Sequence, residues 1–193
     1  MDTFTMSAAA FSELVSAAAF ASTDKDRPLL TGVLLERGEG NTIRAIATDS
    51  YGLVMVDRDA ESIEGNATSV ILSAVDLVRV AKSAKRGEVT LTRVDSRGYL
   101  ANFFGGDSIR VEVIEGTYPD WRLLIPAARG ISEGSGLGFA PALLVKLSKV
   151  APFSNKMTGE PAKLVTLIDS TRPFMFESRD GRTTALFMPV RGN

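Results

Sequence analysis

The hydrophobic residues near the start of the chain have first a helical and then a strand-like period. Between residues 8 and 22 they recur at the i, i+3, i+4 and i+7 spacing that places side chains on one face of a helix. Three short apolar runs follow, and the glycine-rich segment 38–40 between the first two is typical of a hairpin turn. The pattern predicts a helix over residues 8–22 and strands over 29–37, 41–49 and 52–59.

The same order of elements returns twice along the chain. The second block begins with a strand at 68–73, and a capping box formed by Ser73 and Asp76 opens its helix. In the third block Pro141, a residue favoured in the first turn of a helix, follows a short strand at 136–140. The other predicted elements are a helix at 74–85, a helix from Pro141, and strands at 88–95, 98–106, 108–116, 162–169, 172–178 and 183–190. The sequence therefore predicts an α+β fold of three βαβββ units.

These units predict how the chain divides into domains. A helix and its antiparallel strands bury an apolar face only against another layer, so two units side by side are expected to form one domain. Residues 1–126 would then be a complete domain and residues 127–193 half of another. The stretch 117–135, which is rich in Pro and Gly, would connect them.

The composition limits the kinds of functional site that the chain can form. The chain has 193 residues, a net charge of −1, no Cys and no His, which excludes disulfides, thiolate metal sites and the commonest general base. Asp49, Asp57 and Asp59 could together hold a cation, but acids at turns and strand ends are more often solvated, so we expect no metal and no cofactor. The N-terminus has no basic leader, and no apolar run reaches membrane-spanning length. We therefore expect a cytoplasmic, non-enzymatic protein with no membrane partner.

Basic residues gather on one side of the second and third predicted helices. They lie opposite the apolar face of each helix, and acids are nearly absent from both. Most such stripes are solvated helix faces; the functional alternative is a surface that binds DNA through its phosphates without reading the bases. The residues concerned are Arg79, Lys82, Lys85, Arg86, Lys146 and Lys149.

Two further segments are unusual for strand ends. The polar turn 48–52, with an aromatic residue in its middle, directly precedes the apolar run 53–56. The tail 187–193 places Pro189, a residue that interrupts a strand ladder, among apolar residues. Each segment is either a strand with its turn or frayed end, or one wall of an apolar groove.

Several motifs, taken in order, give the chain a family resemblance. They are RPLLTG at 27–32, ATDSYGL at 47–53, TYPDW and LIP within 117–126, and MPVR at 188–191. Together with the three βαβββ units, they resemble the bacterial sliding clamp, the beta subunit of DNA polymerase III. The resemblance implies the DNA-clamp fold, in which helices line a central hole and sheets lie outside. Residues 1–126 resemble the middle clamp domain, and residues 127–193 resemble the last half of the third.

The resemblance also implies a cleft that binds short linear peptides between the middle and third domains. Apolar walls with a polar rim suit hydrophobic anchor residues. A basic residue is usual in the family where this sequence has Gly52, so a wider cleft floor or a different set of partners is expected. The implied cleft residues are Leu30, Thr48, Ser50, Tyr51, Gly52, Leu53, Pro126, Leu186, Met188, Pro189, Val190 and Arg191.

The function implied by the resemblance is that of a DNA replication processivity factor. Its expected partners are duplex DNA, bound without sequence preference, and DNA polymerase and the clamp loader, bound through short linear peptides. A homo-oligomer is also expected, either a dimer in which two half domains pair or a tetramer whose twelve units close a ring. The alternative is a binding module or decoy that holds the same peptides without encircling DNA.

Overall fold

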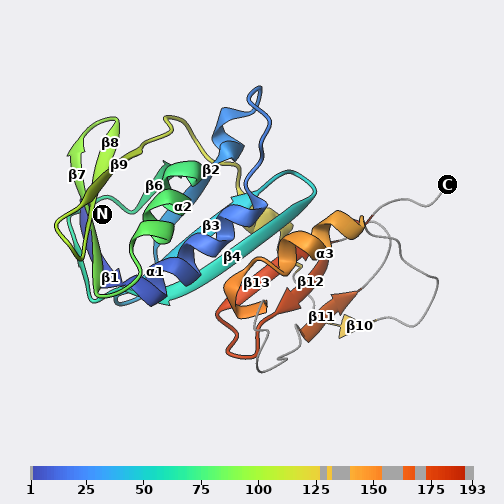
Figure 1. The fold of residues 1–193 in the computed structure, drawn as a ribbon. Helices are drawn as coiled ribbons and strands as arrows, with labels where there is room; N and C mark the ends of the chain where they lie inside the picture. Colours follow the sequence, from blue (N-terminus) through green and yellow to red (C-terminus); the bar gives the residue numbers. More distant parts are fainter. Residues whose placement is uncertain (1, 127–129, 132–139, 154–162, 168–172, 190–193) are drawn as a thin grey trace.

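A computed structural model describes residues 2–126, 130–131, 140–153, 163–167 and 173–189 (Figure 1). The first unit comprises β1 Thr3–Ser7, α1 Ala8–Val15, β2 Gly32–Arg37, β3 Thr42–Thr48 and β4 Gly52–Asp59. The second comprises β6 Ser69–Ser73, α2 Ala74–Ser83, β7 Glu88–Asp95, β8 Gly98–Phe103 and β9 Ser108–Glu112. The third unit contains α3 Pro141–Leu147, β11 Lys163–Leu167, β12 Phe174–Glu177 and β13 Thr183–Phe187. Two short strands, β5 Ser62–Glu64 and β10 Gly130–Ile131, lie between the units.

The first and second units interlock by exchanging their first strands. β1 pairs antiparallel with β7, and β6 pairs antiparallel with β2. One sheet has the strand order β5-β1-β7-β8-β9, and the other has the order β10-β11-β12-β13-β4-β3-β2-β6. Each of the two units therefore supplies a strand to the sheet of the other. The helices and two largely antiparallel sheets confirm the predicted α+β class.

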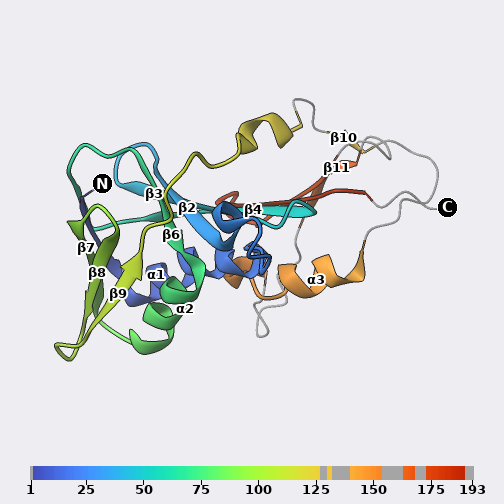
Figure 2. The same ribbon diagram turned by 90° about the horizontal axis from the view of Figure 1, so that it is seen from above.

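The helices lie on one side of the eight-stranded sheet, and the 3-10 turn Trp121–Leu124 lies on the other (Figure 2). The helices α1 and α2 contact each other and cover a core to which both sheets contribute buried residues. On β4, Val54 and Val56 face this core, whereas Leu53 and Met55 face Trp121 on the opposite side. Because β4 is buried on both faces, its sequence is continuously apolar rather than alternating. The fully buried core residues include Phe4, Phe11, Leu14, Leu77, Val80 and Tyr99.

Two element boundaries in the first unit differ from the sequence prediction. The predicted helix 8–22 ends as an α-helix at Val15 and continues only as the 3-10 turn Ser16–Phe20. The Ser16 hydroxyl donates to the carbonyl of Glu13, the kind of local bond that competes with helix continuation. The strand predicted from residue 29 begins at Gly32, because Pro28–Thr31 form a 3-10 turn.

Differences elsewhere concern short strands. The stretch 117–135, predicted as a plain connector, contains β10, which pairs in parallel with β11. The pattern did not single out β1 or β5 as separate strands. The strand predicted at 136–140 lies, apart from Ala140, outside the described residues. In the part of the chain that the structure describes, no helix is long and apolar enough to cross a membrane.

Candidate functional site

The candidate cleft lies where the third unit joins the first. β13 pairs antiparallel with β4, in a register that runs from Phe187 opposite Gly52 to Thr183 opposite Val56. The ring of Phe187 also stacks on Phe20, with ring centroids 5.9 Å apart. This seam brings the tail of the chain beside the turn between β3 and β4, although the two segments are far apart in the sequence.

The turn between β3 and β4, residues 48–52, is held by hydrogen bonds from its own side chains. Oδ1 of Asp49 accepts hydrogen bonds from the backbone N–H groups of Tyr51 and Gly52, both at 2.9 Å. The Thr48 hydroxyl donates to the carbonyl of Gly52 at 2.8 Å and accepts from the N–H of Ser50 at 3.1 Å. Ser50 has a φ of 77°, a left-handed conformation that tight turns use. These bonds fix the turn while leaving the ring of Tyr51 70% exposed.

The tail completes the other wall of the cleft. The N–H of Met188 donates to the carbonyl of Tyr51 at 2.9 Å, and Leu186 lies opposite Leu53 in the ladder. Between turn and tail is a cavity of about 150 Å³. It is lined by Thr48, Ser50, Tyr51, Gly52, Leu53, Leu124, Pro173, Leu186 and Met188.

The structure brings together seven of the residues predicted for the cleft and places others elsewhere. Leu30 is buried in the turn Pro28–Thr31 and does not line the cavity. Pro126 lines a separate cavity beside Trp121. Pro189 is described but does not line the cavity, and Val190 and Arg191 lie outside the described residues.

Two lining residues were not predicted from the sequence. Leu124 comes from the same connector motif as Pro126, and Pro173 directly precedes β12. The signal for Leu124 was its place in the LIP motif, of which it is the first residue and Pro126 the last. Pro173 carried no signal, because its position depends on the pairing of β12 with β13.

Gly52 has a packing role that differs from the expectation of a wider cleft floor. A Cβ atom at this position would lie 2.9 Å from a ring carbon of Phe20 and 3.1 Å from a methyl carbon of Leu143. The missing side chain therefore corresponds to space already filled by the helical layer. Gly52 contributes to the cleft only through its backbone and lets α3 approach β4 closely.

The six basic residues predicted to face DNA have different surroundings. Lys146 on α3 forms an ion pair with Oδ2 of Asp49, whose side chain is only 13% exposed. Arg79 pairs with Asp76 at 3.0 Å, and the guanidinium of Arg86 lies 4.6 Å from the ring centroid of Phe104. The exposed residues Lys82, Lys85 and Lys149 form no ion pair within the described residues.

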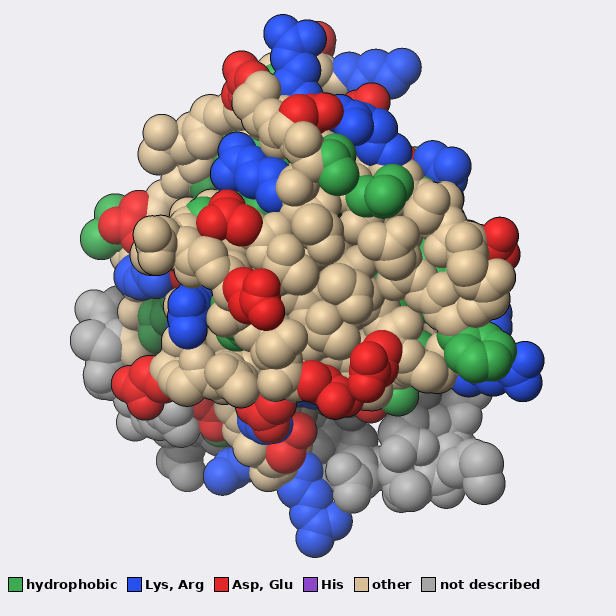
Figure 3. Space-filling model, turned by 90° about the vertical axis from the view of Figure 1, so that its left-hand side faces the viewer, with side chains coloured by type: hydrophobic (Ala, Val, Ile, Leu, Met, Phe, Trp, Pro, Cys, Tyr) green, Lys and Arg blue, Asp and Glu red, His purple; other side chains and the backbone are tan. Residues whose placement is uncertain are grey.

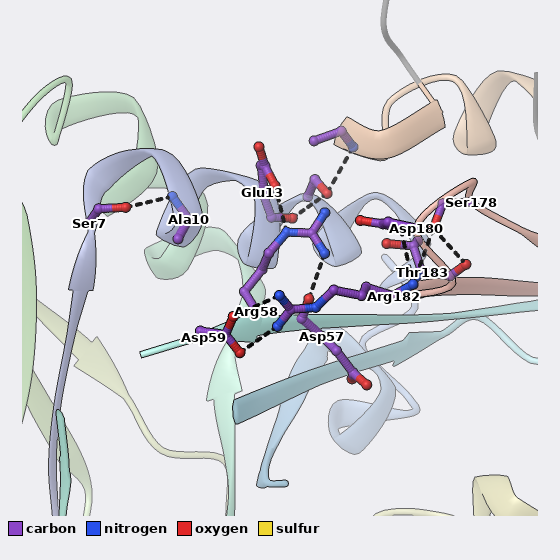
Figure 4. Close-up of polar contacts among 12 residues, drawn as sticks. Ser7, Ala10, Glu13, Asp57, Arg58, Asp59, Ser178, Asp180, Arg182 and Thr183 are labelled. Atoms are coloured by element: carbon purple, nitrogen blue, oxygen red, sulfur yellow. Dashed lines mark hydrogen bonds and ion pairs between the residues drawn. The ribbon is translucent and has the colours of Figure 1, made fainter. Parts of the chain in front are cut away.

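The acids that could have held a cation are each paired with a basic side chain. Asp57 accepts two hydrogen bonds from Arg44, both at 2.7 Å. Asp59 accepts two from Arg182, also at 2.7 Å (Figure 4). The hydrogen bonds from Arg182 hold the pKa of Asp59 below its ordinary value. Among the described residues, no group of three or more acids could hold a metal ion.

Comparison with known proteins agrees with this geometry. A family model described as the central domain of the DNA polymerase III beta subunit matches residues 5–120. This chain belongs to the DNA polymerase III beta subunit family. The beta sliding clamp of Micrococcus luteus is 33% identical over 130 residues, which is 66% of this chain and 42% of that protein. The beta sliding clamp of Pseudomonas aeruginosa is 26% identical over 126 residues, or 64% of this chain and 34% of that protein.

Solved beta subunits share the fold along the whole chain. A sliding clamp from Pseudomonas aeruginosa has a TM-score of 0.79 at 19% identity and covers 98% of this chain and 67% of its own. The beta subunit from Thermotoga maritima has a TM-score of 0.78 at 19% identity and covers 100% and 66%. These matches confirm the clamp fold. The chain spans less than half of the two curated clamps and about two thirds of the solved ones.

Proposed function

We propose that this chain works as a sliding-clamp-type tether that holds replication proteins on DNA. In this proposal it acts in the cytoplasm without catalysing a reaction, and DNA polymerase and the clamp loader bind its cleft through short peptides. One observation carries the proposal: the turn that starts at Thr48 and the tail at Met188 meet around a single, largely apolar cavity.

The cavity suits the insertion of a hydrophobic anchor from a linear peptide. Its walls include Leu53, Leu124 and Leu186, and Met188 adds a flexible side chain that adapts to different partners. Polar groups of Ser50 and Tyr51 lie at the same opening, where they can orient the backbone of the peptide. A few desolvated anchors of this kind supply most of the free energy of peptide binding.

Adjacent leucines provide a matched test of the cleft. Leu124 lines the cavity, whereas its neighbour Leu123 is 82% exposed and does not. In fluorescence anisotropy with a labelled clamp-binding peptide of a bacterial DNA polymerase, Leu124→Ala and Met188→Ala should each weaken binding about 10-fold, or roughly 1.4 kcal/mol. Leu123→Ala should bind as the unmodified chain does. Equal affinities for all three variants would refute the cleft.

Lys82 on α2 and Lys85 just after it are proposed to contact the phosphates of duplex DNA. Lys82 and Lys85 are exposed and free of ion pairs with described residues, so they can replace cations condensed on the DNA phosphates. The double substitution of both lysines by Ala should reduce the slope of log Kobs against log salt by up to about two units. A control that replaces Arg37 and Arg97, also exposed, removes the same charge elsewhere. If both variants have the same slope, the α2 cations are an ordinary solvated face.

Self-association is proposed for the third unit. The flank of α3 exposes Leu144 and Val145, 43% and 57% respectively, which a second third unit could cover. Light scattering at micromolar concentration should give a dimer or tetramer, and Val145→Lys should reduce the mass to that of a monomer. A monomeric mass for the unmodified chain would exclude a homo-oligomeric ring and favour the alternative of a non-ring module that binds the same peptides.

A further inference from the structure

The turn between β8 and β9 carries an exposed aromatic side chain at its tip. Phe104 follows directly after β8 and is 61% exposed. Gly105 and Gly106, with φ values of 110° and 83°, then make the turn in a conformation that favours glycine. Val89 lies opposite Phe103 in the sheet, so the tip lies next to the segment that leaves α2.

That segment holds the aromatic ring in place. Gly87 has a φ of 73°, and a Cβ there would lie 3.2 Å from the Cβ of Phe104, so the two backbones approach closely. The guanidinium carbon of Arg86 lies 4.6 Å from the ring centroid, a distance typical of a cation–π contact. The ring is thus fixed beside a cation while more than half of the side chain stays in solvent.

A groove begins beside this cluster and runs between α1 and α2. It has a volume of about 470 Å³, and the cations Lys85 and Arg86 lie at its margin. Its walls are small residues, which permit a ligand backbone to come close; among them are Ala8, Ala9, Ala81 and Ala84. Seen from the side of the five-stranded sheet, acids and bases are interspersed, and apolar and basic side chains adjoin at the right-hand edge (Figure 3).

We propose that the Phe104 tip and the adjoining groove bind single-stranded DNA where it leaves a duplex. The cations would hold the backbone in the groove, and the ring of Phe104 would stack on an unpaired base. A duplex interior offers no free base face, so this contact adds specificity for a junction rather than for duplex DNA. The inference deepens the proposed DNA contact of Lys82 and Lys85 and rests on it.

The pairing of an aromatic platform with cations favours a nucleic acid over an acidic peptide. Both ligands would satisfy Lys85 and Arg86, but only a strand with unpaired bases also uses a fixed, exposed ring. The tip itself carries the acid Asp107, so electrostatic attraction is confined to the α2 side, along which the DNA backbone would run.

The test compares two DNA probes by fluorescence anisotropy at low salt. One is a blunt duplex; the other is the same duplex with a single-stranded oligo-dT extension and 2-aminopurine at the first unpaired position. Phe104→Leu keeps an apolar side chain but removes the ring, and it should weaken binding of the extended probe about 10-fold and leave the blunt duplex unchanged. Phe104→Tyr should bind like the unmodified chain, and both ring-bearing forms should quench 2-aminopurine.

Controls separate this inference from the broader proposal. Val94→Ala truncates another exposed apolar side chain, on β7, and should change neither probe. If Phe104→Leu binds the extended probe normally, or loses affinity equally for both probes, the stacking contact is refuted while duplex binding by Lys82 and Lys85 stands. If neither probe binds the unmodified chain at low salt, the DNA-tethering function and this inference both fail.

Discussion

The first unit holds its two neighbours in different ways. Between the first and second units, strands are exchanged and the buried contacts are apolar, as at Phe11 and Leu77. The third unit exchanges no strand with the first: it is attached through the strand pair of β4 with β13 and apolar contacts such as Phe187 on Phe20, and ion pairs lie near both ends of the strand pair. Lys146 pairs with Asp49 at one end, and Arg182 pairs with Asp59 at the other.

This difference bears on where the candidate cleft lies. An exchanged, apolar interface is insensitive to salt and separates only with global unfolding, whereas partly exposed ion pairs are weakened by salt and fix orientation more than stability. The cleft is built at the junction of the first and third units, where the ion pair of Asp49 supplements the apolar contacts. Partner binding and the attachment of the third unit should therefore be thermodynamically coupled.

The largest effect should come from the apolar interface. Leu77 is fully buried, and Leu77→Ala should lower the free energy of unfolding by about 2–5 kcal/mol. Leu143→Ala on α3 should fall at the low end of that range, because its surroundings include the exposed flank and can relax into the space. Urea unfolding followed by circular dichroism would measure both. A larger loss for Leu143→Ala would invert the comparison.

A smaller loss of folding stability is expected when a side chain is added at Gly52, where β4 and α3 pack closely. The added Cβ of Gly52→Ala would press on Phe20 and Leu143, at the cost of about 1–3 kcal/mol. Because the strain falls between β4 and α3, it should speed hydrogen exchange in α3 more than in α2. An equal change of the hydrogen-exchange rates in α2 and α3, or a stability equal to that of the unmodified chain, would show that α3 does not depend on this close approach.

Two lysines, one in the last turn of α3 and one just after it, allow the effect of an ion pair on stability to be compared with that of a solvated charge. Lys146→Ala leaves the carboxylate of Asp49, 13% exposed, without its cation and should cost about 1–2 kcal/mol. Lys149→Ala, two residues after the end of α3, removes an exposed lysine without an ion pair among the described residues and should stay within about 0.5 kcal/mol. Thermal unfolding of the two variants would measure the difference. Equal stabilities would mean that the Asp49 pair contributes nothing to the seam.

The order of elements and seven of the nine residues that line the cavity were accessible from the sequence because their signals are local. Helical and alternating periods identify the helices and strands, and short motifs identify the turn at Thr48 and the tail at Met188. The partner of Lys146 was not accessible, since Asp49 approaches it only after β4 and β13 pair. The same stripe of lysines that predicted a DNA surface on α3 thus includes a residue already engaged inside the protein.

Gly52 illustrates a second limit of sequence comparison. A missing side chain suggests an opening, but the direction of the absent Cβ is decided by strand register. The register places it toward Phe20 and Leu143, on the side away from Leu53 and Met55. Strand exchange between the first two units was equally inaccessible, because periodicity does not identify which strands become neighbours.

The smallest effect on stability should come from the ion pair of Asp59 with Arg182, which lies at the end of the β4–β13 pair opposite to Asp49. Hydrogen bonds from Arg182 hold its pKa below the ordinary value of 3.8, so the stabilisation is present above that pH and is lost as the pH falls through the folded-state pKa. Arg182→Gln should move the pKa of Asp59, measured by NMR titration of the carboxyl carbon, back upward. Asp95, whose pKa is lowered by Arg110 within the second unit, should keep its value and serve as the control. A parallel rise at Asp95 would mean that the variant perturbs the whole fold rather than the attachment of the third unit.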